Sequence, residues 1–507
     1  MDKILVLDFG SQYSHLICRR IREFSVYAEL VPYDISLDEL KKMNPKGLVF
    51  SGGPANVYNK DSPQPPSGIF EMGLPVLGIC YGHQLIVNNF GGKVKQANRE
   101  YGSSLLSIDS DSDLLSGIGK STRAWMSHGD AAEALPKGFE VIGHTENSFA
   151  AAIANRQKLI YGIQFHPEVV HTERGTQVLK NFVLNICKAK QDWTLENFIE
   201  STVSEISKID GNVLCGISGG IDSTVAALLI KETIGSRLKC VFVDNGLLRL
   251  NEEKDVEEIF KNNFEMNFTV IDAKDRFLDK LRGVTDPEKK RMIVGEEFVR
   301  VFSEFAEKNG PFKWLAQGTL YPDVIESGVS KGPAAIIKTH HNVGGLPSWL
   351  DLQVLEPLRY LYKDEVRKVG KILGVPTKIL NRHPFPGPGL AVRVIGEVTP
   401  EKLQICKLAS KIVEDELISS GWHDKVWQAY AAVGDDRAVG VAGDERKYGH
   451  VVLVRVVDSI DAMTADWTRL PSDILERISN RITNEVDDVA WVSYVVSSKP
   501  PATIEPQ

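Results

Sequence analysis

A seven-residue run rich in Gly and Ser follows an apolar stretch at 212–217 and precedes a predicted helix at 225–235. A strand that leads into such a turn and then a helix points several backbone N–H groups, and the positive end of the helix dipole, at one spot. Adjacent glycines allow close approach, and the hydroxyls add donors. The pattern predicts a polyphosphate cradle; a plain βα turn with a Ser or Asp cap is the alternative. The run consists of Ser218, Gly219, Gly220, Ile221, Asp222, Ser223 and Thr224.

A second pattern places a cysteine between two glycines, in the string Gly78-Ile79-Cys80-Tyr81-Gly82. A cysteine at a strand-to-helix turn is the thiol counterpart of the G-x-S-x-G elbow, in which a strained turn holds the nucleophile clear of the sheet. A helix start beneath the thiol favours the reactive thiolate. The alternative is a buried structural cysteine.

A histidine and a glutamate at the end of another predicted strand, His166 and Glu168, favour the catalytic interpretation. In a Cys80–His166–Glu168 triad, the histidine takes the thiol proton and returns it to the leaving group, and the glutamate fixes its tautomer. His128 is a rival for the base, but it lacks the His-x-Glu arrangement. Backbone N–H groups of Gly53 and Tyr81 can supply an oxyanion hole.

These segments resemble class I glutamine amidotransferases over about residues 4–188, and the S-G-G-x-D-S-T run resembles the loop of the ATP pyrophosphatase superfamily. The first resemblance implies glutamine hydrolysis through a thioester on Cys80, releasing ammonia, with Gln84 helping to hold glutamine. The second implies cleavage of ATP between its α and β phosphates. Mg²⁺ would offset the pyrophosphate charge, with Asp222 as a candidate ligand.

Five further strings, in their order along the chain, resemble the glutamine-hydrolysing GMP synthetase family. They lie at 290–295, 315–327, 338–347, 356–359 and 382–390. The resemblance covers nearly the whole chain. It implies a carbon–nitrogen ligase of de novo guanine nucleotide synthesis that converts xanthosine monophosphate (XMP) to GMP, uses ATP to give AMP and pyrophosphate, and takes ammonia from glutamine.

The same resemblance implies the remaining site residues. Asp323, Glu326 and Lys338 would belong to a lid over the adenylated nucleotide. Asp244, at the end of a predicted strand, could contact ribose or adenine or could cap the next helix. The XMP contacts carried over are Arg291, Pro388, Gln428, Lys499 and Glu505. The chain ends Glu505-Pro506-Gln507 where the family pattern has Glu-Trp-Glu, so a role for the last two residues is in doubt.

The elements that must position these residues read as an α/β protein. Short apolar runs at 3–8, 46–50 and 75–79, with helical patterns between them, predict parallel βα units. We expect a class I amidotransferase domain at 1–189, an adenine-nucleotide α-hydrolase-like (ATP pyrophosphatase) parallel-sheet domain at 190–382, and a small α+β domain at 383–507. In the last we expect helices at 400–420 and 471–485 and strands at 426–433, 437–441, 450–458 and 490–497. The resemblance implies a homodimer through this domain.

Composition narrows the function classes. The chain has 507 residues, 43% of them apolar, and a formal charge of −8 with no basic block, which argues against nucleic-acid and membrane partners. The first residues lead straight into a strand and no window approaches a membrane span, so we expect a cytoplasmic protein. Six scattered cysteines without a C-x-x-C pair fit reduced thiols. The rivals are an NAD synthetase, a tRNA thiolase and a non-catalytic sensor.

Overall fold

The computed structural model describes residues 1–111, 113–326, 337–338, 352–459 and 464–507. The chain forms two compact units, one containing Met1–Glu200 together with Ile325 and Glu326, and the other containing Ser201–Val324 and the described residues from Ile337 to Gln507. The α/β class predicted from the sequence is confirmed. In the described residues, no helix is both long and apolar enough to cross a membrane.

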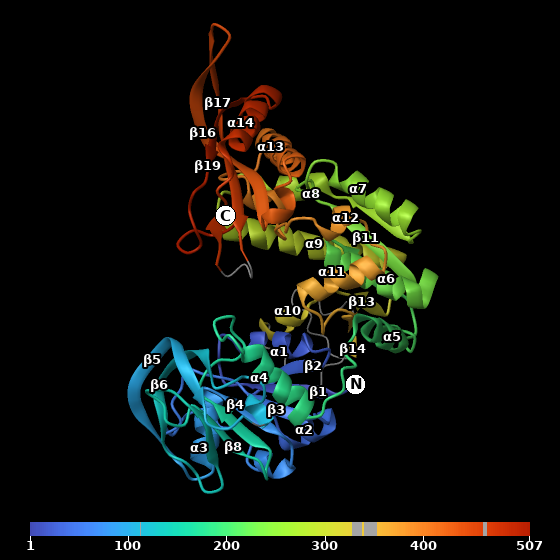
Figure 1. The fold of residues 1–507 in the computed structure, drawn as a ribbon. Helices are drawn as coiled ribbons and strands as arrows, with labels where there is room; N and C mark the ends of the chain where they lie inside the picture. Colours follow the sequence, from blue (N-terminus) through green and yellow to red (C-terminus); the bar gives the residue numbers. More distant parts are fainter. Residues whose placement is uncertain (112, 327–336, 339–351, 460–463) are drawn as a thin grey trace. The chain divides into compact units, whose positions relative to one another are not determined.

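The first unit is built on a mixed sheet (Figure 1). Its strands, in spatial order, are β2 (Tyr27–Pro32), β1 (Lys3–Asp8), β3 (Gly47–Phe50), β4 (Val76–Ile79), β9 (Ile160–Ile163), β8 (Ala152–Asn155), β7 (Glu140–His144), β5 (Lys93–Ile108) and β6 (Ser121–Ala134). The strands from β2 to β9 are parallel, and the others continue the sheet antiparallel. Sequence patterns predicted β1, β3, β4 and the strand before His166, missed β2, and gave no sign of the antiparallel extension.

Helices and an apolar core hold the parallel strands in place. The helices are α1 (Ser14–Arg22), α2 (Leu37–Met43), α3 (Tyr81–Asn89) and α4 (Gly175–Lys180), whereas α5 (Leu195–Ile206) crosses the division between the two units after Glu200. Leu5, Leu48, Val76 and Leu85 are fully buried in one core cluster. Polar residues at the carboxyl ends of β1, β3, β4 and β9 therefore meet at one edge of a rigid sheet.

The second unit contains a sheet of order β12 (Phe268–Asp272), β11 (Leu238–Asp244), β10 (Val213–Ile217), β13 (Trp314–Ala316), β15 (Gln353–Leu355) and β14 (Ile337–Lys338). It is parallel except for the β14–β15 pair. The chain runs outward from β10 in one direction and then in the other, so the loop after β10 lies at the topological switch point, where open α/β sheets bind ligands. That loop is the predicted phosphate cradle.

The helices that lie wholly or mostly in this unit are α6 (Ile221–Ile234), α7 (Glu252–Glu258), α8 (Lys274–Leu281), α9 (Pro287–Asn309), α10 (Tyr321–Glu326), α11 (Lys363–Ile372), α12 (Thr377–Leu380), α13 (Pro400–Ser419) and α14 (Ser472–Glu485). Helix α6 begins at Ile221 and not near 225, because the end of the glycine-rich run forms its first turn. Helix α6 is buried on nearly all sides, since every residue from Ser223 to Ile230 is buried.

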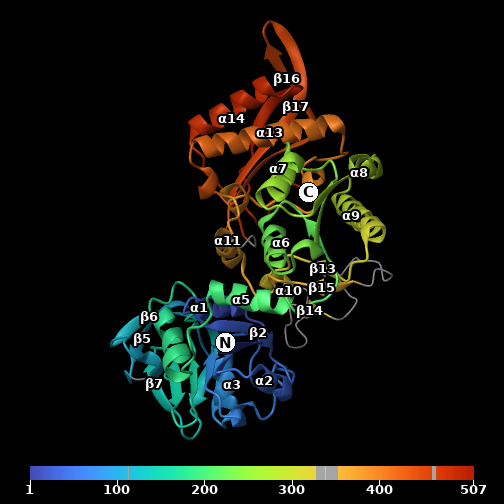
Figure 2. The same ribbon diagram turned by 90° about the vertical axis from the view of Figure 1, so that its right-hand side faces the viewer.

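The carboxyl-terminal part carries a second sheet made of β16 (Gln428–Ala442), β17 (Glu445–Asp458), β18 (Asp466–Trp467) and β19 (Val489–Tyr494). Strands β16 and β17 form a long hairpin (Figure 1), and α13 and α14 lie side by side (Figure 2). Two separate strands were predicted where β16 runs continuously. The predicted gap is a bulge between Val433 and Arg437.

One apolar core extends across the predicted boundary at 382/383. Phe277 and Val294 on one side belong to the same buried cluster as Leu390, Ile412 and Val454 on the other. This shared core explains why residues on both sides belong to one compact unit. The three-domain division remains a prediction.

Candidate active sites

Cys80 lies in the turn between β4 and α3, with φ +52° and ψ −101°, a conformation that residues with side chains rarely adopt. The flanking glycines are required. A Cβ on Gly78 would lie 2.3 Å from the carbonyl oxygen of Gly82, and a Cβ on Gly82 would lie 2.5 Å from that of Phe50. The strand, the strained turn and the helix have the arrangement of a nucleophile elbow.

His166, which follows β9, is held beside this thiol. Its Nδ1 lies 2.8 Å from Glu168 Oε1. Its backbone N–H donates to Trp125 O at 3.0 Å, and Thr172 Oγ1 donates to its carbonyl at 2.6 Å. Burial lowers the pKa of His166, but hydrogen bonds with Cys80 and Glu168 outweigh it and raise the pKa from 6.5 to about 10. His166 is therefore placed to exchange a proton with the Cys80 side chain.

A cavity of about 430 Å³ lies in front of Cys80, and Gly53, Tyr81 and Gln84 are among the residues that line it. Gly53 packs closely, since a Cβ there would lie 2.5 Å from Phe9 O. Tyr81 is the first residue of α3, where backbone N–H groups lack partners within the helix. The cavity therefore offers donors for an oxyanion, as predicted for Gly53 and Tyr81, whose role stays a prediction.

The rival base, His128, also lines the cavity, but both of its ring nitrogens have partners. Nε2 lies 3.2 Å from Glu100 Oε2, and Nδ1 lies 3.0 Å from Asp130 O. Neither interaction involves the thiol. The geometry favours His166 as the base.

Gln164 is a residue that the sequence interpretation missed. Its Nε2 donates to Cys80 Sγ at 3.7 Å, and its Oε1 accepts from Gln84 Nε2 at 3.4 Å. The same Gln84 nitrogen donates to Asp130 O at 2.8 Å. Gln164 stands two residues before the base, so its place in the string was the available signal.

The glycine-rich run after β10 forms the predicted loop. Gly219 has φ +74°, and the backbone N–H of Ser218 donates to Ser223 Oγ at 3.1 Å. Ser218 Oγ accepts from Gly220 N at 3.3 Å, and Thr224 Oγ1 donates to Gly220 O at 2.8 Å. These bonds fix the loop at the positive end of α6, where an anion is favoured.

Asp222 extends from this loop. Its Oδ2 pairs with Lys363. Its Oδ1 is buried and has no hydrogen-bond partner in the described part of the chain. A carboxylate oxygen of this kind suits Mg²⁺, which takes one or two carboxylates together with substrate phosphates. Among the described residues, no group of three or more His, Cys, Asp or Glu could hold a metal by itself.

Asp244, at the end of β11, has other partners. Its Oδ1 accepts from Gly246 N at 3.0 Å, and its Oδ2 lies 2.9 Å from Lys274 Nζ. Both carboxylate oxygens of Asp244 therefore have partners within the protein. The side chain stabilises the turn after β11, which is close to the predicted alternative in which Asp244 caps the next helix.

Three of the five residues carried over as XMP contacts, Gln428, Glu505 and Arg291, contact one another or the last residue of the chain. Gln428 Nε2 donates to Glu505 Oε1 at 2.7 Å and to Pro384 O at 3.1 Å. Arg393, which the sequence interpretation missed, makes two hydrogen bonds to Glu505, at 3.0 and 2.9 Å. Pro388 precedes a short 3₁₀ helix, Gly389–Val392.

The last residue, whose role was in doubt, is tied to α9. Arg291 Nη2 donates to Gln507 O at 2.6 Å, and the buried Lys290 donates to Gln507 Oε1 at 2.6 Å. The backbone of Lys499 pairs with that of Ala465. The structure thus brings Gln428 and Glu505 into contact and Arg291 to the same tail.

Comparisons with known proteins cover the whole chain. Family models match glutamine amidotransferase class-I at residues 5–186, NAD synthase at 193–301 and the GMP synthase C terminal domain at 415–506. GMP synthase [glutamine-hydrolyzing] of Caldanaerobacter subterraneus subsp. tengcongensis is 56% identical over 507 residues, 99% of each chain. The enzymes so named from Caldicellulosiruptor saccharolyticus and Brachyspira hyodysenteriae are 54% and 52% identical, over 99% or more of each chain. This chain belongs to the GMP synthase family.

Membership of the GMP synthase family decides among the rivals from the sequence. The NAD synthase match is limited to 193–301, in the ATP-binding part. The amino-terminal match is to class I amidotransferases, as predicted. The resemblance to a glutamine-hydrolysing ligase is confirmed.

The predicted lid of the GMP synthase family lies largely outside the described residues, which omit 327–336 and 339–351. Asp323 Oδ2 accepts from Leu320 N at 2.9 Å, at the start of α10. Glu326 ends α10, and Lys338 pairs with Val354 in the sheet. Their lid role stays a prediction.

Proposed function

We propose that this chain converts XMP to GMP, with ATP giving AMP and pyrophosphate and with ammonia drawn from glutamine. The observation that carries the proposal is 52–56% identity to glutamine-hydrolysing GMP synthases over the full length. Both predicted sites fit it. The first unit contains a thiol beside a histidine–glutamate pair, and the second contains a glycine-rich loop at a switch point.

In the first site, the Cys80 thiolate attacks the amide carbon of glutamine. Backbone N–H groups of Gly53 and Tyr81 stabilise the oxyanion, and protonated His166 delivers a proton to the departing ammonia. Water, deprotonated by His166, then cleaves the thioester to give glutamate. Glu168 keeps the Nδ1 proton of His166 directed toward itself, so Nε2 faces the reaction.

In the second site, the loop from Ser218 to Thr224 holds the pyrophosphate end of ATP by backbone and hydroxyl donors. The carbon-2 oxygen of XMP attacks the α phosphorus, and pyrophosphate leaves. Ammonia then attacks carbon 2, and AMP leaves. Asp222 would hold Mg²⁺, which supplies charge neutralisation of the phosphates.

The choice of XMP as the substrate that receives the adenylyl group rests on the residues around Glu505. Gln428 Oε1 is buried and has no hydrogen-bond partner in the described residues, while its nitrogen donates to Glu505. These residues offer hydrogen-bond acceptors for the N–H edge of a purine, and Arg291 offers a positive charge for the phosphate. XMP presents both groups.

The experiment mixes the protein with MgATP, an ammonium salt and one candidate acceptor at a time, and measures AMP. AMP is expected with XMP and not with deamido-NAD, the acceptor of the NAD synthetase rival. AMP with deamido-NAD alone would overturn the proposal. The cytoplasmic location and the absence of nucleic-acid partners stay predictions.

A homodimer through the carboxyl-terminal domain is the second part of the proposal. Val439, Val441 and Tyr448 on the β16–β17 hairpin are 54%, 76% and 62% exposed. Val439 and Val441 are two residues apart, and Val439 pairs with Tyr448, so the three share a face. An exposed apolar face of this kind fits a twofold interface.

A further inference from the structure

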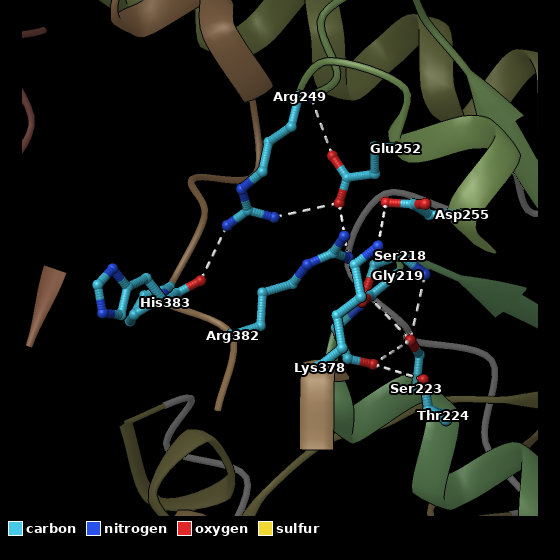
Figure 3. A network of polar contacts seen from close by, with 12 residues as sticks. Ser218, Gly219, Ser223, Thr224, Arg249, Glu252, Asp255, Lys378, Arg382 and His383 are labelled. Carbon is cyan, nitrogen blue, oxygen red and sulfur yellow. Dashed lines mark hydrogen bonds and ion pairs between the residues drawn. The ribbon is translucent and has the colours of Figure 1, made fainter. Parts of the chain in front are cut away.

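A buried carboxylate outside both reaction centres links the phosphate loop to the acceptor turn at 383–390. Glu252, the first residue of α7, is 2% exposed. Its Oε1 lies 3.1 Å from Arg249 Nη1 and 2.9 Å from Arg382 Nη1, and its Oε2 accepts from Arg249 N at 3.0 Å (Figure 3). One glutamate therefore holds two guanidinium groups.

The first guanidinium reaches the phosphate loop. Arg382 Nη1 also donates to Gly219 O at 2.9 Å, as Figure 3 shows. Gly219 lies so close to the pair that a Cβ would be 3.2 Å from Arg382 Nη1 and 3.3 Å from Glu252 Oε1. The left-handed turn of the phosphate loop at Gly219 therefore packs directly against the Glu252–Arg382 ion pair.

The second guanidinium reaches the acceptor turn. Arg249 Nη2 donates to His383 O at 2.9 Å, and its guanidinium lies 4.2 Å from the centre of the Phe385 ring. Arg393, which binds Glu505, lies 5.0 Å from the same ring. Burial lowers the pKa of Arg249 to about 10, and the charge of Glu252 opposes this effect. Without Glu252 the two arginines would be like charges in a partly buried site.

We propose that Glu252 is a positioning residue, which sets the phosphate loop and the acceptor turn at the spacing that adenylyl transfer needs. Its oxygens are engaged by Arg249 and Arg382, so it acts through them and not on substrate. The inference rests on the proposed function, in which ATP occupies the loop and XMP the turn. Displacement of either reactant by about 1 Å costs up to roughly 100-fold in rate.

The test uses Glu252→Gln in the full chain. Gln keeps the size and an acceptor for Arg249 N but removes the charge. We expect the KM values for MgATP and for XMP to rise together, and kcat for ammonia-supported AMP formation to fall roughly 10- to 100-fold. A merely structural role would reduce the active fraction and leave both KM values unchanged, and that result would overturn the inference.

The matched control is Asp255→Asn, on the same helix. Asp255 pairs with Lys378 at 2.8 Å at a more exposed position, with side chains 33% and 64% exposed. This variant should keep both KM values and kcat within about twofold, because exposed pairs contribute little. Equal effects of the two substitutions would contradict a specific role for Glu252.

Two further variants keep the inference falsifiable if Glu252→Gln does not fold. Arg382→Lys replaces the guanidinium whose Nη1 contacts both Glu252 and Gly219 O with an ammonium that lacks the planar fork. Arg249→Lys keeps the charge but loses the separate Nη2 donor to His383 O. We expect the first to raise mainly the KM for MgATP and the second mainly the KM for XMP. The same KM pattern in both would overturn the inference. A wild-type protein that forms no AMP with XMP would instead overturn the proposed function, and this inference with it.

Discussion

His166 Nδ1 lies 2.8 Å from Glu168 Oε1, a hydrogen bond between two side chains that are both buried. The carboxylate directs one ring nitrogen toward itself and helps to raise the pKa of His166 to about 10. The ring is therefore held as an imidazolium whose Nε2 side is available to the thiol.

Replacing Glu168 by Gln should slow glutamine hydrolysis by about 10²- to 10⁴-fold, because the tautomer is no longer fixed. The same change should move the alkaline limb of the kcat/KM profile for glutamine to lower pH. Loss of the His166 proton, at a pH near 10 in the wild type, removes the proton that ammonia needs, and Gln no longer supports that high pKa. Glutaminase assays from pH 6 to 10.5 check this. An alkaline limb that does not move would show that Glu168 does not support the raised pKa of His166.

Replacing Cys80 by Ala should abolish GMP formation from glutamine and spare formation from added ammonium salt. The nucleophile is lost, but the loop after β10 and the residues around Glu505 that are proposed to bind XMP lie in the other unit. Parallel assays with the two nitrogen sources decide the matter. Loss of both activities would mean that Cys80 is not simply the glutaminase nucleophile.

The sequence was most informative where function depends on a short stretch of chain. The strand at 3–8 was predicted with the bounds it has, and the turns at Cys80 and at Ser218 follow buried strands as expected. These features are local, since apolar periodicity and glycine placement specify them directly.

Contacts between distant positions could not be predicted in this way. Lys363 meets Asp222 across 141 residues, and Arg393 meets Glu505 across 112. In the sequence, Lys363 and Arg393 have no neighbours that distinguish them from ordinary solvent-exposed charged residues. The bulge at Val433 was read as a strand end, because Gly434, Asp435 and Asp436 interrupt the β pattern while the pairing resumes beyond them.

Replacing Asp222 by Ala should reduce AMP formation at least about 100-fold from either nitrogen source. The change removes the carboxylate that fits Mg²⁺ and the partner of Lys363. Glutamine hydrolysis at Cys80 in the absence of nucleotides serves as the folding control. Unchanged AMP formation would remove Asp222 from the ATP site.

Replacing Gly82 by Ala should destabilise the first unit by about 1–3 kcal/mol, because the new Cβ would lie 2.5 Å from the carbonyl oxygen of Phe50. Gly295, in the exposed part of α9, is a matched control: a Cβ there meets nothing within 4 Å. Gly295→Ala should stabilise its helix by about 0.5–1 kcal/mol. Thermal melts followed by circular dichroism compare the two. Equal shifts would show that the close approach to Phe50 is relaxed at little cost.

Replacing Val439 and Val441 together by Asp should dissociate the proposed dimer. Both side chains lie on the exposed face of the hairpin with Tyr448, so two carboxylates would be buried against an apolar partner surface. Light scattering should give twice the chain mass of 56.2 kDa for the wild type and one chain mass for the variant. Val170, 76% exposed in the other unit, provides the control, since Val170→Asp should leave the mass unchanged. A double variant that keeps the wild-type dimer mass would place the interface elsewhere. A wild-type protein with the mass of one chain would rule out the proposed dimer.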